Sequence, residues 1–281
     1  MGVRKNQATL TVEEKAAFVA AIKALKADGT YDHHVQEHRD GILSFNPDVA
    51  HGGPAFYPWH RECLRRFELQ LQAVDPTVTI PYWDPTVDNS PSSSLWASDF
   101  MGGNGEGSTY EVMTGPFAYS TGTWTLNVTD NRRQPPYLRR AFGVKVATLP
   151  SATTLNSTLN RVPYDASPWN TQTSTTQSFR KSSETSVHNR VHNWVGGTMQ
   201  GASSPNDPVF WLLHCVLDRH WARWQKMHPT EPYLPESGGP VGHNLNDPMW
   251  PWSSEVSPPT PASVLDHRAL GYEYDDEATW T

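Results

Sequence analysis

The 281-residue chain has little cysteine, no long apolar run and a modest share of charged residues. Its two cysteines, Cys63 and Cys215, exclude a disulfide scaffold and a cysteine-rich zinc or iron–sulfur protein. No apolar run approaches the roughly 18 residues of a membrane span, and the N-terminus lacks the apolar segment of a secretory signal. Charged residues of both signs are interspersed at a net charge of −7, which argues against nucleic-acid binding.

Histidine, tryptophan and proline are abundant in contrast, with 12, 12 and 24 residues. Twelve histidines are enough for a metal centre built from imidazoles, although the number alone does not demand one. The positions of the histidines on the predicted helices therefore have to decide between a metal site and ordinary core or surface residues.

Helix signals occur in five segments, approximately residues 11–29, 31–43, 59 onward, 186–195 and 207–227. The first begins with Thr11 and Glu14 at the spacing of a capping box, followed by apolar residues on one face. The last begins with Asp207 and Pro208, because Asp is a good N-cap and Pro suits the first helical position. These segments predict a mainly α-helical protein.

The remaining segments have a different composition. Residues 74–187 are rich in Ser, Thr, Gly, Asn and Pro, which predicts mostly loops with a few short strands and helix turns. Residues 229–281 contain nine prolines, which predicts an extended segment that wraps the surface. We therefore expect a single domain over residues 1–281, with residues 229–281 as a proline-rich tail.

The segments that begin at Pro54 and Pro208 resemble each other. Each has Pro, Phe, an aromatic residue and His at offsets 0, 2, 3 and 6, and the histidines are His60 and His214. Each histidine lies near the start of an expected helix with an apolar stripe. The similarity fits two related half-sites, one from each helical pair, although chance is the alternative.

Two groups of histidines have spacings suited to metal binding. His188 and His192 lie one helical turn apart, and a helical hairpin would bring His214 opposite them. The second group contains His38 and His60, and the pattern leaves two candidates for the third histidine of this group. These candidates are His51, which lies in a loop, and His34, which lies four residues before His38; His33 is weaker.

Sites with three imidazoles and no carboxylate suit Cu, Zn or Fe rather than Mg or Ca, and non-haem iron usually includes a carboxylate. Two such sites, each with open positions, fit a pair of copper ions that bind dioxygen between them. A zinc protein is the alternative, although the stretch from His188 to His192 lacks the glutamate of an HExxH motif.

Five motifs resemble the tyrosinase family, and most closely its short actinomycete members: Pro54–Arg61, Pro81–Asp84, His188–His192, Trp194–Gly197 and Asn206–Trp211. The likeness extends from the N-terminal helix to Trp224. It implies a four-helix bundle around a type-3 dicopper site, with long loops and few short strands. It also assigns one copper to His38, His51 and His60, and the other to His188, His192 and His214. The remaining histidines match no ligand position: His33, His34, His220, His228, His243 and His267.

The resemblance implies an oxidoreductase that uses two copper ions and O2 as co-substrate to oxidise small aromatic substrates. Family members convert ortho-diphenols to ortho-quinones, and true tyrosinases also hydroxylate monophenols. In the family a glutamate and an asparagine are thought to hold the water that takes the proton of a monophenol, and Glu184 and Asn189 match them by type. The segment before His188 is shorter here, so a solvated loop carboxylate is the alternative interpretation of Glu184.

Three residues are expected to border the substrate pocket. Leu213 stands where the family commonly has a further histidine, Asn193 follows a ligand, and Ser204 lies in the loop before Asn206. The alternatives are a solvent-facing Asn and an ordinary loop Ser. Some bacterial members of the family oxidise ortho-aminophenols, which need no hydroxylation, to quinone imines.

We therefore expect an oxidase of ortho-aminophenols or ortho-diphenols with weak or absent monophenol hydroxylation. The alternatives are a standard melanin-forming tyrosinase and, from another class, a dicopper oxygen carrier. The resemblance further implies a small partner protein that delivers copper and can carry the enzyme out of the cell. We thus expect the chain to be cytoplasmic or exported with that partner. Asp218, one turn after His214, is expected to be a structural ion-pair partner; the alternative is an acceptor for the ring N–H of a ligand histidine. Both cysteines are expected to be buried fillers.

Overall fold

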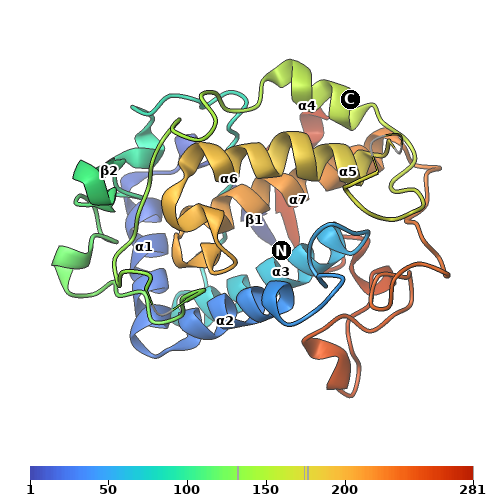
Figure 1. Ribbon diagram of the computed structural model, residues 1–281, viewed down its shortest axis with the longest axis horizontal. Coiled ribbons are helices and arrows are strands. Elements are labelled where there is room, and N and C mark those ends of the chain that lie inside the picture. The colour runs from blue at the N-terminus through green and yellow to red at the C-terminus, as the bar shows by residue number, and fades with distance from the viewer. Residues whose placement is uncertain (132, 174, 176, 281) are drawn as a thin grey trace.

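The computed structural model describes residues 1–131, 133–173, 175 and 177–280. It is mainly helical, with long connections and few short strands, as the sequence predicted (Figure 1). The helices are α1 (Val12–Ala27), α2 (Thr30–Leu43), α3 (Phe56–Val74), α4 (Ala152–Leu159), α5 (Phe179–Ser183), α6 (Asn189–Val195) and α7 (Val209–Met227). Within the described part of the chain, none of these helices combines the length and the apolar character needed to span a membrane.

The five expected helices are all present, with differences at their N-terminal ends. The capping box of α1 is formed, because Thr11 Oγ1 accepts from Glu14 N–H and the Glu14 carboxylate accepts from Thr11 N–H. Helix α3 begins at Phe56, earlier than the expected start near Trp59. Helical structure before His192 begins as early as Phe179, because the side chain of Ser178 caps α5.

One π-helical turn, Glu184–His188, joins α5 to α6, and the three pieces form one continuous helical segment (Figure 1). Such turns place an extra residue in a helix and occur frequently at functional sites. Glu184 and His188 stand at the two ends of this turn and both are buried.

The two ends of the chain meet in a short parallel pair of strands. Strand β1 (Gly2–Arg4) pairs with β4 (Tyr272–Tyr274), and a second hairpin pairs β2 (Gly105–Glu106) with β3 (Glu111–Val112). The described part of the tail, residues 229–280, forms turns, short 3₁₀ segments and strand β4, and it also supplies large side chains to the core. Trp252 is 4% exposed, so this proline-rich tail stabilises the interior in addition to covering it.

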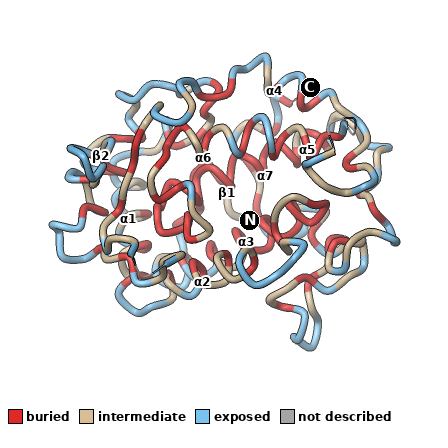
Figure 2. The backbone as a smooth tube through the Cα atoms, viewed as in Figure 1, coloured by how far each residue is buried: buried red, intermediate tan, exposed pale blue. Residues whose placement is uncertain are grey.

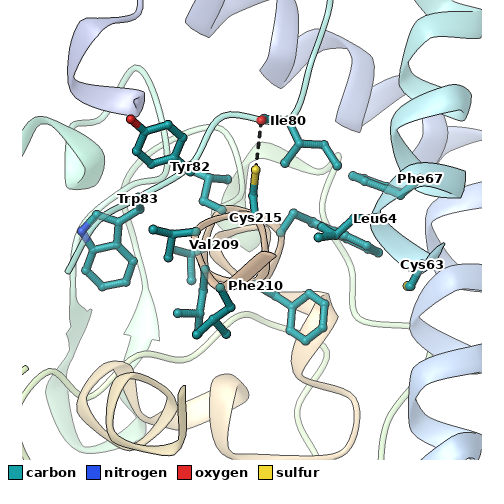
Figure 3. Packing of buried hydrophobic residues seen from close by; sticks show 14 of the residues in the cluster. Cys63, Leu64, Phe67, Ile80, Tyr82, Trp83, Val209, Phe210 and Cys215 are labelled. Carbon is teal, nitrogen blue, oxygen red and sulfur yellow. Dashed lines mark hydrogen bonds between the residues drawn. The ribbon is translucent and has the colours of Figure 1, made fainter. Parts of the chain in front are cut away.

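Helix α7 lies at the centre of the molecule. Every residue from Val209 to Ala222 is buried, as the burial-coloured trace in Figure 2 shows along this helix. In Figure 3, Phe210 and Cys215 project from it among side chains of α3 and the segment around Ile80, and Cys215 Sγ lies 3.3 Å from the Ile80 carbonyl oxygen. Both Cys215 and Cys63 are buried and unpaired, which confirms their interpretation as fillers.

A buried cluster of charged and phenolic groups connects α3 and α7 with the paired ends of the chain. Asp218 accepts from Arg61 Nε at 2.5 Å and from Arg4 Nη1 at 3.2 Å. It also accepts from the hydroxyls of Tyr272 and Tyr274 at 2.5 and 2.6 Å. Asp218 is therefore a structural ion-pair partner, as its position in the sequence suggested.

Candidate metal centre

Six histidines form two triads at the centre of the helical bundle. The first triad combines a side chain of α2, one of the following loop and one of α3, and the second combines the π-helical turn, α6 and α7. In each triad the candidate ligand atoms all lie within 4.8 Å of one another. The two triads are His38, His51 and His60, and His188, His192 and His214.

The structure resolves the rivalry between His34 and His51. His51 lies beside His38 and His60, with ring centroids 5.0 and 4.8 Å away. His34 instead packs edge-on against Phe67 in the core, at 5.4 Å. His34 therefore packs in the core and is not a metal ligand, although it lies one helical turn before His38.

Each described triad fits a bound metal ion, because ring nitrogens are left buried and unpartnered. Four of the histidines use Nδ1 in a hydrogen bond and keep an orphaned Nε2: His38, His60, His188 and His192. The acceptors, in the same order, are the carbonyl oxygens of Ala202 and Phe56, the side-chain oxygen of Asn189 and the carbonyl oxygen of Met199, at 2.6–2.9 Å. An Nδ1–H that donates in this way leaves the lone pair on Nε2 free for a metal.

Burial favours neutral, metal-binding imidazoles. Loss of solvation lowers the pKa of His38 to about 3 and that of His192 to about 4. It also lowers the pKa well below the ordinary value in His60, His188 and His214. His51 is the exception, because burial would lower its pKa but the Asp48 carboxylate, 3.2 Å from Nδ1, raises it. Metal ions bind neutral imidazole.

A cavity of about 820 Å³ opens onto the triads. Four predicted site residues outside the triads line it: Glu184, Asn189, Asn193 and Ser204. Leu213 does not, and the expectation that it borders the pocket was wrong. Consecutive residues of a helix point in different directions, so Leu213 does not share the direction of His214, the residue that follows it on α7. The side chain of Leu213 is fully buried in the hydrophobic core.

Glu184 is buried at 3% exposure, so it is not a solvated loop carboxylate. Its Oε1 accepts from the Gly52 N–H at 2.6 Å, and its Oε2 accepts from Arg180 Nη1 at 2.8 Å. Asn189 lies at the exposed rim, and its side-chain oxygen contacts His188 Nδ1 at 2.9 Å. The structure therefore brings both residues to the cavity and gives each a protein partner.

Sequence reasoning missed two aromatic residues of the cavity wall. His243, which matches no ligand position, lines the cavity, and its Nδ1 accepts from the Ala55 N–H at 3.1 Å. Trp169 lines it as well, from a Ser- and Thr-rich segment without periodicity. Neither has a helical spacing to the triads, so no sequence pattern connected them with the site.

Comparison with known proteins supplies the family. A family model described as "Common central domain of tyrosinase" matches residues 18–227, which include both triads. The chain belongs to the tyrosinase family. The tyrosinase of Streptomyces antibioticus is 48% identical to this tyrosinase-family chain, over 95% of the chain and 97% of that protein. Grixazone synthase of Streptomyces griseus is 41% identical, over 97% of this chain and 99% of that protein.

The fold is shared more widely than the sequence. A functional unit of octopus hemocyanin aligns with a TM-score of 0.63 at 22% identity, covering 98% of this chain and 68% of that one. The likeness concerns the fold alone. Family membership and the two orphaned triads together identify copper as the cofactor of both sites, and the protein as a dicopper phenol oxidase that uses O2.

Proposed function

We propose that this tyrosinase-family oxidase converts ortho-diphenols and ortho-aminophenols to ortho-quinones and quinone imines, with weak or absent monophenol hydroxylation. The observation that carries the proposal is the engagement of both Glu184 oxygens by Gly52 and Arg180. Hydroxylation of a monophenol requires a group that takes the phenolic proton, directly or through a water. A carboxylate that anchors a backbone N–H and a guanidinium is less available for that task.

The remaining cavity residues suit a substrate that already has two polar ring substituents. The Asn189 oxygen accepts from His188 Nδ1, so this residue orients one of the candidate copper ligands. Asn193 lies half-buried on the cavity wall beside His192, and its amide can hydrogen-bond an amine or hydroxyl of the ring. The buried Ser204 adds a hydroxyl to the same wall.

The reaction needs no further reductant. When bound, the two copper ions transfer electrons from substrate to O2. Two substrate molecules each give up two electrons and two protons, and one O2 becomes two waters. The triads hold the metal, and the cavity admits and orients the aromatic ring.

A standard tyrosinase is the second candidate, and two observations favour it. Glu184 and Asn189 both line the cavity, where the family places its water-holding pair. Leu213 lies outside the cavity, which removes one of the reasons to expect an altered pocket.

Initial O2 uptake by the copper-loaded protein tests the proposal, with catechol, 2-aminophenol and tyrosine measured in parallel and without a diphenol primer. We expect prompt uptake with the two ortho-substituted rings and little with tyrosine. Prompt uptake with tyrosine would contradict the proposal and support a standard tyrosinase. Reversible O2 binding without oxidation of any of the three would support an oxygen carrier.

A further inference from the structure

Trp169 lies on the wall of the copper cavity without an aromatic neighbour. Within the described part of the chain, every other tryptophan has its ring close to another aromatic or imidazole ring, as in the pairs Trp59–Trp252 and Trp83–Trp96. Trp169 has no such partner and is only half-buried. Among the described residues, Trp169 is thus the tryptophan that lines the cavity and pairs with no other ring.

The backbone of Trp169 adopts a conformation that bulky residues rarely take. Its φ is +61°, in the left-handed region, and the only other described non-glycine residue with a positive φ is Tyr110. A glycine would occupy this position without strain, whereas a large side chain raises its cost. Such strain is typical of functional sites, where the side chain is needed for something other than stability.

The surrounding contacts fix the backbone of Trp169 relative to the loop that carries His51 of the first triad. The N–H of Trp169 donates to the Ala166 carbonyl at 3.0 Å, and the adjacent Asp165 is paired with Arg180 at 2.7 Å. On the other side the backbone lies against the loop that follows His51. A Cβ added to Gly53 in that loop would lie 3.7 Å from the Trp169 carbonyl oxygen.

We propose that Trp169 is a substrate-binding residue whose indole stacks against the aromatic ring of the substrate. The cavity, at about 820 Å³, is much larger than a single-ring phenol, so a bound ring needs a wall that restricts its orientation. An indole face provides this through offset or edge-to-face contact. The inference rests on the proposed function only in requiring an aromatic substrate, and it holds equally for a standard tyrosinase.

Because the indole neither ligates copper nor accepts a proton in this proposal, we expect its removal to weaken substrate binding and to leave the chemical step largely unchanged. Trp169→Gly removes the ring and also relieves the positive φ. We expect it to raise KM for catechol about 3- to 10-fold, as loss of one aromatic pair predicts, with kcat within about 2-fold of wild type. Trp169→Phe, which keeps a ring, should stay within about 2-fold in KM.

Tyr110→Gly is the matched control, because it relieves the same backbone strain at an exposed residue away from the cavity. It should leave KM unchanged. All variants are checked for copper content and for the midpoint of thermal unfolding, which we expect to be retained in Trp169→Gly. An unchanged KM in fully loaded Trp169→Gly would overturn the proposal, and so would a loss of copper that accounts for the change.

Calorimetric binding of two unreactive probes makes the test independent of turnover. Benzoate has a flat aromatic ring, and cyclohexanecarboxylate has the same charge without one. We expect wild type to prefer benzoate, and Trp169→Gly to lose most of that preference. Equal preference in both proteins would contradict the stacking role. Because neither probe is oxidised, this result stands whether or not the protein prefers ortho-aminophenols to tyrosine.

Discussion

The ring of His60 stacks on the ring of His214, with centroids 4.2 Å apart and an interplanar angle of 19°. His60 projects from α3 and His214 from α7, and these two helices pack directly against each other. The pair therefore joins the two triads across the core. The distance between the two metal sites is set by the packing of α3 on α7, which depends on buried side chains such as Phe67 and Phe210.

The first prediction concerns copper stoichiometry. His38→Ala and His192→Ala each remove one ligand from a different triad, so each variant should bind about one copper per chain in place of two. Metal analysis after dialysis measures this directly. His33→Gln is the control, because the side chain of His33 is 68% exposed and belongs to neither triad. Retention of two coppers in either alanine variant would contradict the assignment.

The second prediction concerns Asp130, which holds the loop that orients His38. Its carboxylate accepts from Ala202 N–H at 3.0 Å and Ser203 N–H at 2.7 Å, and the Ala202 carbonyl in turn accepts from His38 Nδ1. Groups that orient a metal-binding histidine typically contribute 10- to 100-fold to metal affinity. Asp130→Ala should therefore weaken copper binding by about 10-fold or more, as competition with a chelator would measure.

Asp130→Asn keeps one acceptor oxygen and should lose less copper affinity than Asp130→Ala. Asp99→Asn, at an exposed position away from the triads, should bind copper like wild type. A wild-type copper affinity in Asp130→Ala would show that the loop holds its shape without the carboxylate.

The third prediction concerns stability. Asp218→Asn removes one charge from a buried cluster and leaves Arg61 and Arg4 undercompensated. Breaking a buried pair in this way typically costs 3–5 kcal/mol, so we expect the free energy of unfolding to fall by about 3 kcal/mol. Urea denaturation at neutral pH measures the difference.

The same variant has a defined pH dependence. Burial acts to raise the pKa of Asp218, but Arg61 and Arg4 outweigh it and the pKa lies below its ordinary value. The stabilisation is therefore fully present above the unfolded pKa of about 3.9 and is lost as the pH falls through the lower folded value. The difference between wild type and Asp218→Asn should be constant above about pH 5 and shrink in stronger acid. A difference that grew below pH 4 would contradict this sign.

The fourth prediction tests the part assigned to Glu184. Glu184→Gln keeps an oxygen for Gly52 N–H but removes the charge that pairs with Arg180. If Glu184 acts as an anchor, kcat for catechol should stay within about 2-fold, with a lower midpoint of thermal unfolding. A large and selective loss of tyrosine hydroxylation at unchanged stability would instead make Glu184 part of a proton-accepting pair.

Much of this site could be predicted from the sequence because its residues lie on helices. The spacing of His188 and His192 fixes their common face, and the motif around His60 repeats at His214. The start of the helix at Phe179 was missed because the helix propensity of a Ser-rich stretch is weak. The helix forms there because Ser178 caps its first turn and tertiary packing outweighs the weak propensity.

The choice between His34 and His51 could not be made from spacing, since it depends on how a loop folds back onto two helices. Trp169 and His243 come from segments without periodicity, and only the tertiary fold brings them to the cavity. Leu213 was misplaced because sequence adjacency to a ligand says nothing about the direction in which a side chain points. The copper-delivering partner and the cellular location remain predictions.

The central claim is that the two triads work as one dinuclear copper oxidase. Oxygen uptake with catechol tests it most directly, measured on wild-type protein that holds no copper, on the one-copper variants His38→Ala and His192→Ala, and on wild-type protein with two coppers per chain. We predict uptake only in the two-copper protein, with about one O2 consumed for every two catechols. Comparable uptake by either one-copper variant, or none by the two-copper protein, would contradict the claim.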